Sequence, residues 1–155
     1  MKIIFLDIDG VLNCETTADA VGNYTGIEDK KVRLLSEIVR QTDALIVLTS
    51  TWTEFWYREE SKKELQDAFA NHLDEKLNAC GLSVFDKTED RIFDRGKGIL
   101  QFIKGYEPEA FVILDDNLFD FRETGLADHL IRTDLSVGLT REDAARAISA
   151  LSGRG

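Results

Sequence analysis

Near its start the chain reads Ile3-Ile4-Phe5-Leu6-Asp7-Ile8-Asp9-Gly10-Val11-Leu12-Asn13. The first four residues form the apolar run of a buried strand, and Asp7 and Asp9 follow where that strand ends. An ionised carboxylate that leaves water must be paired or bound to a cation. At the carboxyl end of a parallel strand, such acids face the crevice where α/β folds bind ligands. A simple Asx-Gly turn is the alternative interpretation of this stretch.

Apolar runs recur along the chain and alternate with segments of helical periodicity. The runs predict strands over residues 3–6, 44–48, 82–85, 110–114 and 129–132. The periodic segments predict helices over residues 30–41, 61–80, 98–104 and 140–151. The central runs are nearly all apolar rather than alternating, which indicates burial on both faces of a parallel sheet. We therefore expect an α/β fold, a three-layer, doubly wound, Rossmann-like parallel sheet of about five strands.

Length and charge limit the classes of protein to which the chain can belong. Its 155 residues fit a single domain over residues 1–155. The net charge of −10 opposes non-specific binding to nucleic acid. A local group of basic residues, either a binding patch or a solvated face, consists of Arg91, Arg95, Lys97 and Lys104.

Cysteine usage and hydropathy predict the cellular compartment. The two cysteines, Cys14 and Cys80, lack CxxC spacing, which points to a reducing compartment and excludes a disulfide scaffold or a zinc cluster. The start of the chain has no signal-peptide pattern, and no apolar stretch is long enough to span a bilayer. We expect a cytoplasmic protein without membrane contact.

A second strand end carries hydroxyl groups. The run over residues 44–48 leads into Thr49, Ser50 and Thr51. Hydroxyls and free backbone N–H groups at the start of a helix form a site for a phosphate-like anion. The alternative is ordinary helix capping.

A third strand end carries two adjacent acids. Asp115 and Asp116 follow the run over residues 110–114, and such neighbours repel one another unless a cation lies between them. With Asp7 and Asp9 they form a set of hard oxygen ligands that suits Mg²⁺.

A lysine stands at the start of the helix that precedes this strand. Lys97, between Gly96 and Gly98, lies in the first turn, where the helix dipole disfavours a positive charge. Its ammonium group is expected to reach the acids and a bound phosphate. The alternatives are an ordinary surface lysine, or Arg95 of the same turn in this role.

These four features, in this order, resemble the motifs of the haloacid dehalogenase (HAD) superfamily. They are Asp7-Ile8-Asp9-Gly10-Val11-Leu12, the strand followed by Thr49-Ser50, Lys97 at a helix start, and Leu114-Asp115-Asp116. The resemblance covers about the whole chain and implies the sheet order 5-4-1-2-3. Residues 13–30 leave room only for a loop, and residues 53–94 are accounted for by helix and one strand. The chain therefore resembles the capless members.

The resemblance implies a Mg²⁺-dependent phosphatase with an aspartyl-phosphate intermediate. Asp7 would be the nucleophile and Asp9 the general acid and base, with Lys97, or Arg95 in its place, neutralising the phosphoryl charge. The second acid, Asp9, favours a phosphatase over a dehalogenase, which needs no proton for its leaving group. Phosphate oxygens would be held by Thr49 or Ser50, Gly10 and Arg95. Mg²⁺ would be held by Asp7, Asp9 through its main-chain carbonyl, Asp115 and Asp116.

The run Thr49-Ser50-Thr51-Trp52 is most similar to that of HAD domains associated with RNA repair proteins, although Thr53 stands where those tend to have Arg. The expected substrate is a phosphomonoester, on a nucleic-acid end or a nucleotide. One alternative is a small-molecule phosphatase such as a nucleotidase, because the acid pair is also reminiscent of 5′-deoxyribonucleotidases. Another is a non-catalytic phosphate-binding module. A receiver domain is disfavoured, because its acid pair ends the first strand.

Overall fold

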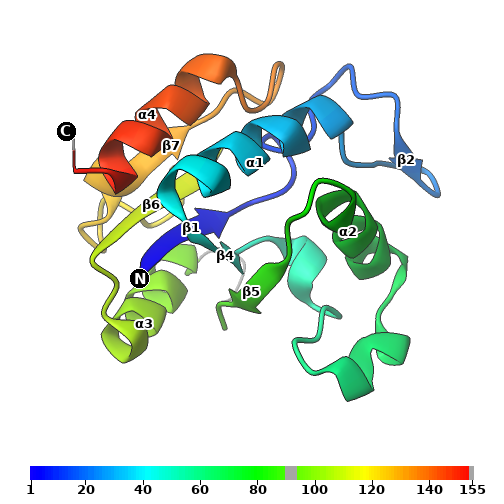
Figure 1. Cartoon of the computed structure of the whole chain (residues 1–155), viewed down its shortest axis with the longest axis horizontal. Helices are drawn as coiled ribbons and strands as arrows, with labels where there is room; N and C mark the ends of the chain where they lie inside the picture. The colour runs from blue at the N-terminus through cyan, green and yellow to red at the C-terminus, as the bar shows by residue number, and fades with distance from the viewer. Residues whose placement is uncertain (90–93, 154–155) are drawn as a thin grey trace.

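The computed structural model of the chain describes residues 1–89 and 94–153. Its main sheet has five parallel strands in the order β5-β4-β1-β6-β7 (Figure 1). The strands are β1 (Lys2–Leu6), β4 (Leu45–Leu48), β5 (Val84–Lys87), β6 (Ala110–Asp115) and β7 (Leu130–Arg132). When the strands of this sheet alone are numbered along the chain and the sheet is read from β7 to β5, this is the expected 5-4-1-2-3 order. The predicted fold class is confirmed, and each predicted strand is present within about two residues.

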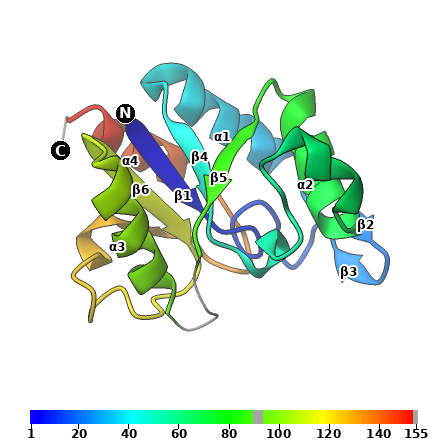
Figure 2. The same ribbon diagram turned by 90° about the horizontal axis from the view of Figure 1, so that it is seen from below.

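Helices cover both faces of the sheet, as Figures 1 and 2 show. The described residues form four α-helices, α1 (Asp29–Thr42), α2 (Ala68–Ala79), α3 (Arg95–Tyr106) and α4 (Arg141–Leu151). Helices α1 and α4 lie side by side on one face, and α3 covers the other. The hydrophobic core therefore has two layers, one on each face of the sheet. Ile4 and Leu6 pack with residues of α1 and α4, and Phe5 packs with Ile99 of α3. Because successive residues of a strand point to opposite faces, both core layers require the unbroken apolar run.

The sheet hydrogen bonds continue one residue past the strands, and this aligns the functional edge. The residues concerned are Asp7, Thr49, Thr88 and Thr133, each directly after its strand. Their N–H groups donate, at 2.9–3.0 Å, to the carbonyl oxygens of Leu114, Leu6, Leu48 and Asp115. The backbone at these positions is therefore held as firmly as the strands themselves.

The helix predicted over residues 61–80 is wrong in its first third. The structure has a 3₁₀ helix, η2 (Glu60–Leu65), then two extended residues, and only then α2. The carboxylate of Asp67 accepts a hydrogen bond from the N–H of Ala70 at 2.8 Å and so starts a new helix. Helix α4 begins with a capping box formed by Thr140 and Asp143.

The segment over residues 13–30, expected to be a loop, contains a small antiparallel hairpin. Its strands are β2 (Ala20–Val21) and β3 (Tyr24–Thr25). The hairpin lies next to α2, near the short 3₁₀ helix η1 (Thr51–Thr53) that follows β4. A third 3₁₀ helix, η3 (Ala127–His129), precedes β7. Residues 1–89 and 94–153 contain no separate cap domain, and in these ranges no helix combines the length and the hydropathy needed to cross a membrane.

Candidate active site

The carboxyl ends of the central strands bring Asp7, Asp115 and Asp116 together. One carboxylate oxygen from each lies within 4.8 Å of the others. Burial and the neighbouring charge of Asp115 raise the pKa of Asp7 well above its usual value. Burial likewise raises the pKa of Asp115 to about 6. These carboxylates carry full charge together only when cations offset them.

The donor set of this cluster fits Mg²⁺. Three carboxylates on rigid strand ends offer hard oxygen ligands, and such an ion binds one or two of them plus water and phosphate oxygens. Gly10 is required for the approach of Asp116, because a Cβ atom there would lie only 2.6 Å from Cγ of Asp116. Its φ of +82° also favours glycine. Gly10 therefore shapes the cluster by its lack of a side chain.

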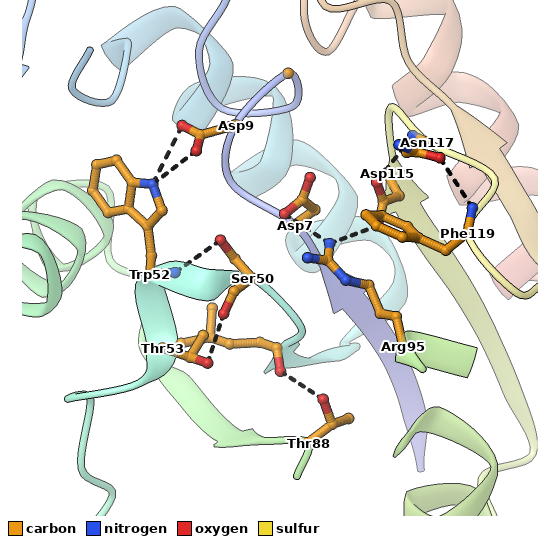
Figure 3. Close-up of polar contacts among 12 residues, drawn as sticks. Asp7, Asp9, Ser50, Trp52, Thr53, Thr88, Arg95, Asp115, Asn117 and Phe119 are labelled. Atoms are coloured by element: carbon orange, nitrogen blue, oxygen red, sulfur yellow. Dashed lines mark hydrogen bonds and ion pairs between the residues drawn. The ribbon is translucent and has the colours of Figure 1, made fainter. Parts of the chain in front are cut away.

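Arg95 supplies a positive charge to the same cluster. Its Nη1 lies 3.0 Å from Oδ1 of Asp7 and 2.9 Å from Oδ2 of Asp115 (Figure 3). The residue is only 4% exposed, and its guanidinium group lies 4.3 Å from the centre of the Phe119 ring. Burial of an arginine is tolerated because two carboxylates pair with it.

Lys97 does not reach the carboxylates. Its side chain is 72% exposed, and Nζ lies 3.8 Å from Oδ1 of Asp94. Two residues further along a helix, a side chain is turned by about 200°. The inward position of Arg95 therefore directs Lys97 to solvent. Of the two basic residues that the sequence analysis left open, the structure brings Arg95 to the cluster.

The loop after β6 fixes the start of α3. The carboxylate of Asp120 accepts hydrogen bonds from the N–H groups of Gly96 at 2.6 Å and Lys97 at 3.3 Å. A Cβ atom at Gly96 would collide with Thr124 and Asp120. Asp115 is the last residue of the strand that leads into this loop. The same loop therefore fixes the position of Asp115 relative to Arg95, which lies at the start of α3.

The basic group suggested by the sequence is not assembled as a patch by the described residues. Arg95 faces the buried acids, whereas Lys97 and Lys104 are exposed. Arg91 lies outside the described residues.

Asp9 is separated from the other acids. Its carboxylate accepts hydrogen bonds from Nε1 of Trp52 at 3.2 and 3.3 Å and from Nδ2 of Asn13 at 2.9 Å. In Figure 3 it points toward Trp52 rather than toward Asp7. Asp9 is also exposed, whereas Asp7 is 6% exposed. The site thus has a buried charged side and an open side that begins at Asp9.

Trp52 and Asn13 are the site residues that the sequence analysis did not assign. Asn13 also accepts a hydrogen bond from the N–H of Gly10 at 2.9 Å and donates to the carbonyl of Gly26 at 3.0 Å. It therefore braces the loop that carries both acids. Trp52 comes directly after the hydroxyl run, but no spacing in the sequence links it to an acid 43 residues earlier.

The two hydroxyls after β4 have different surroundings. Oγ1 of Thr49 is buried and, among the described residues, has no hydrogen-bond partner. Oγ of Ser50 accepts a hydrogen bond from the N–H of Trp52 at 3.2 Å. A buried hydroxyl without a partner costs about 1–3 kcal/mol, and an oxygen of a bound anion would relieve that cost. Thr49 is therefore the better candidate to contact a ligand through its side chain.

Comparison with known families supports the fold class described above. The model of the HAD domain in Swiss Army Knife RNA repair proteins matches residues 3–144. The chain belongs to this family. The match spans all five strands of the main sheet and ends within α4, so the resemblance drawn from the motifs is confirmed. No curated protein and no solved structure matches the chain. Membership supports phosphatase-type chemistry for this HAD domain in an RNA repair setting.

Proposed function

We propose that this HAD domain is a Mg²⁺-dependent phosphatase that hydrolyses a phosphomonoester through an aspartyl-phosphate at Asp7. The observation that carries the proposal is the pairing of a buried Asp7 with Arg95, beside the acids of β6. A carboxylate in this position is oriented by Nη1 of Arg95, which holds its Oδ1. The unpartnered hydroxyl of Thr49, on the neighbouring strand end, supports a phosphate site at the same edge.

The first step forms the covalent intermediate. An oxygen of the Asp7 carboxylate attacks phosphorus, and the bond between phosphorus and the leaving oxygen breaks. Arg95 offsets the negative charge that gathers on the phosphoryl group. Asp9 donates a proton to the leaving oxygen, so that the product departs as a neutral alcohol.

The second step regenerates the enzyme. Asp9, now ionised, accepts a proton from water, and the water oxygen attacks phosphorus. The bond between phosphorus and Asp7 breaks, phosphate leaves, and the carboxylate is restored. Trp52 and Asn13 would hold Asp9 on the leaving-group side of the site, as their hydrogen bonds to its carboxylate suggest.

Asp116, directly after β6, is proposed as the main metal ligand, together with Asp7 and the main-chain carbonyl of Asp9. Both oxygens of Asp115 are already engaged, Oδ2 by Arg95 and Oδ1 by the N–H of Asn117. Asp115 would therefore orient Arg95 more than it binds the ion. Bound Mg²⁺ would supply charge neutralisation on the phosphoryl oxygens and on Asp7.

The proposed substrate is a phosphorylated nucleotide or nucleic-acid end, in keeping with the RNA repair setting of the family. The test is phosphate release from nucleoside monophosphates and 5′- and 3′-phosphorylated oligonucleotides, with Mg²⁺ or with a chelator. We expect metal-dependent release from the native chain and a loss of at least about 100-fold in Asp7→Asn. Asp128→Asn, an exposed acid before β7, is the matched control. Full activity of folded Asp7→Asn would overturn the covalent mechanism.

A further inference from the structure

A cleft of about 570 Å³ opens on the exposed side of the site, next to Asp9. Asp9 and Trp52 belong to both the cleft and the catalytic arrangement. The walls come from the hairpin β2–β3, the segment that begins with η1, and the start of α2. A volume of this size suits one small organic group. Because Asp9 is the proposed proton donor to the leaving oxygen, the cleft is where the leaving group would lie.

Aromatic rings form much of the wall. Tyr24 and Phe55 are 67% and 46% exposed, although both are large apolar side chains. The rings of Trp52 and Tyr24 each meet the edge or face of Phe69, with ring centres 5.0 and 5.5 Å apart. Tyr24, whose exposed ring packs against Phe69, and the exposed ring of Phe55 provide flat surfaces on which a nucleobase can stack.

The charge of the cleft is acidic. Four carboxylates line it, from Asp9, Glu15, Glu54 and Asp67, and its described lining includes no lysine or arginine. A second phosphate would be repelled by this lining. A nucleobase is uncharged, and its exocyclic amino groups donate hydrogen bonds that carboxylates accept. The lining therefore suits an amino-bearing base and opposes a polyanion.

We propose that this cleft binds the nucleoside of the leaving group, with its base stacked against Tyr24 and Phe55. The preferred substrate is then a nucleoside monophosphate, and a second phosphate on the ribose weakens binding. The inference rests on the proposed phosphatase function and narrows its substrate class.

The first experiment compares kcat/KM, with Mg²⁺, for adenosine monophosphate, ribose 5-phosphate and adenosine 3′,5′-bisphosphate. We expect the monophosphate to exceed both others by at least about tenfold, because stacking on aromatic rings is strong. Equal values for the monophosphate and ribose 5-phosphate would overturn the cleft assignment and leave the phosphatase standing. A bisphosphate as good as the monophosphate would overturn the exclusion of a second phosphate.

Variants test the aromatic wall and the acidic lining of the cleft independently. Tyr24→Ala is expected to raise KM for adenosine monophosphate about tenfold without changing KM for ribose 5-phosphate, and Tyr24→Phe retains the native values. The double variant Glu15→Gln, Glu54→Gln is expected to improve use of the bisphosphate. The control is Tyr106→Ala, a partly exposed tyrosine of α3 on the other face of the sheet. An unchanged KM in Tyr24→Ala would contradict the stacking role.

Binding of adenosine tests the cleft without turnover. Calorimetry on the native chain and on Asp7→Asn is expected to give the same Kd for adenosine, and Tyr24→Ala is expected to raise that Kd about tenfold. If no phosphomonoester is hydrolysed but adenosine binds in this pattern, the phosphatase proposal fails and the nucleoside site stands. If adenosine does not bind, the nucleoside site fails whatever the activity.

Discussion

The two sides of the site differ in how they are built. Around Asp7, buried charges are paired on the ends of adjacent strands, and Arg95 comes from the first turn of a helix. Around Asp9, exposed rings and carboxylates come from a hairpin, a 3₁₀ segment and a helix start. The buried side offers charge and fixed geometry, which phosphoryl transfer needs. The open side offers the surface that we propose binds the leaving nucleoside.

The largest effect is expected from Arg95→Ala, on the buried side. It removes the charge that we propose offsets the phosphoryl group, and it leaves Asp7 and Asp115 without Arg95 as their ion-pair partner, so kcat should fall by about 100-fold or more. Unfolding free energy should also fall, by about 3–5 kcal/mol. Steady-state kinetics and urea denaturation measure the two effects. Lys97→Ala is the matched control, and its kcat should stay within about twofold of the native value. A larger loss of kcat in Lys97→Ala than in Arg95→Ala would instead assign the catalytic role to Lys97.

The next effect concerns the metal. Asp116→Asn should raise the Mg²⁺ concentration for half-maximal activity by at least about tenfold, since it removes the proposed direct ligand. Asp115→Asn should instead lower kcat more than it shifts the Mg²⁺ titration, because Asp115 holds Arg95. Activity titrations of both variants make the comparison. If Asp115→Asn shifts the titration more, the assignment of the main ligand is reversed.

A smaller effect is expected at the border of the two sides. Trp52→Phe keeps a ring in the cleft but removes the indole N–H that donates to Asp9. With a nucleotide, kcat should fall about threefold to tenfold, because protonation of the leaving oxygen is impaired. With p-nitrophenyl phosphate, whose leaving group needs no proton, kcat should change little. Equal losses on both substrates would mean that Trp52 acts on the fold rather than on Asp9.

The smallest effect is on the stability of the metal-free protein. Asp7 has a raised pKa in the folded state, and that of Asp115 is about 6 against an ordinary value of 3.8. The folded state therefore keeps protons that the unfolded state has lost, so stability falls as pH rises from about 4 through about 6. In chelator, Tm should be lower at pH 7 than at pH 5. Added Mg²⁺ should reduce this difference in Tm between pH 5 and pH 7, because the ionised acids are its proposed ligands. A Tm that rises from pH 5 to pH 7 would contradict the raised pKa values of Asp7 and Asp115.

The buried side was largely predictable from the sequence, and the open side was not. Asp7, Thr49 and the acids after β6 follow unbroken apolar runs, and parallel strands end at one edge of a sheet. The choice between Arg95 and Lys97 was open because the sequence does not fix where α3 begins. The hairpin near Tyr24 has strands of two residues, too short for a periodic signal. Asp9 is also held by Trp52, 43 residues later in the chain, and their contact depends on tertiary packing.

The continuation of the sheet hydrogen bonds past β1 and β4 has a kinetic consequence. The amides of Asp7 and Thr49 donate to carbonyls inside the sheet, so their hydrogens should exchange with solvent only when the sheet itself opens. The amides of the hairpin, on an exposed two-residue ladder, should exchange much faster, through local opening. Asp7, the proposed nucleophile, thus moves with the most slowly exchanging part of the molecule. The walls of the cleft can rearrange around successive ligands, or change over evolution, without disturbing it.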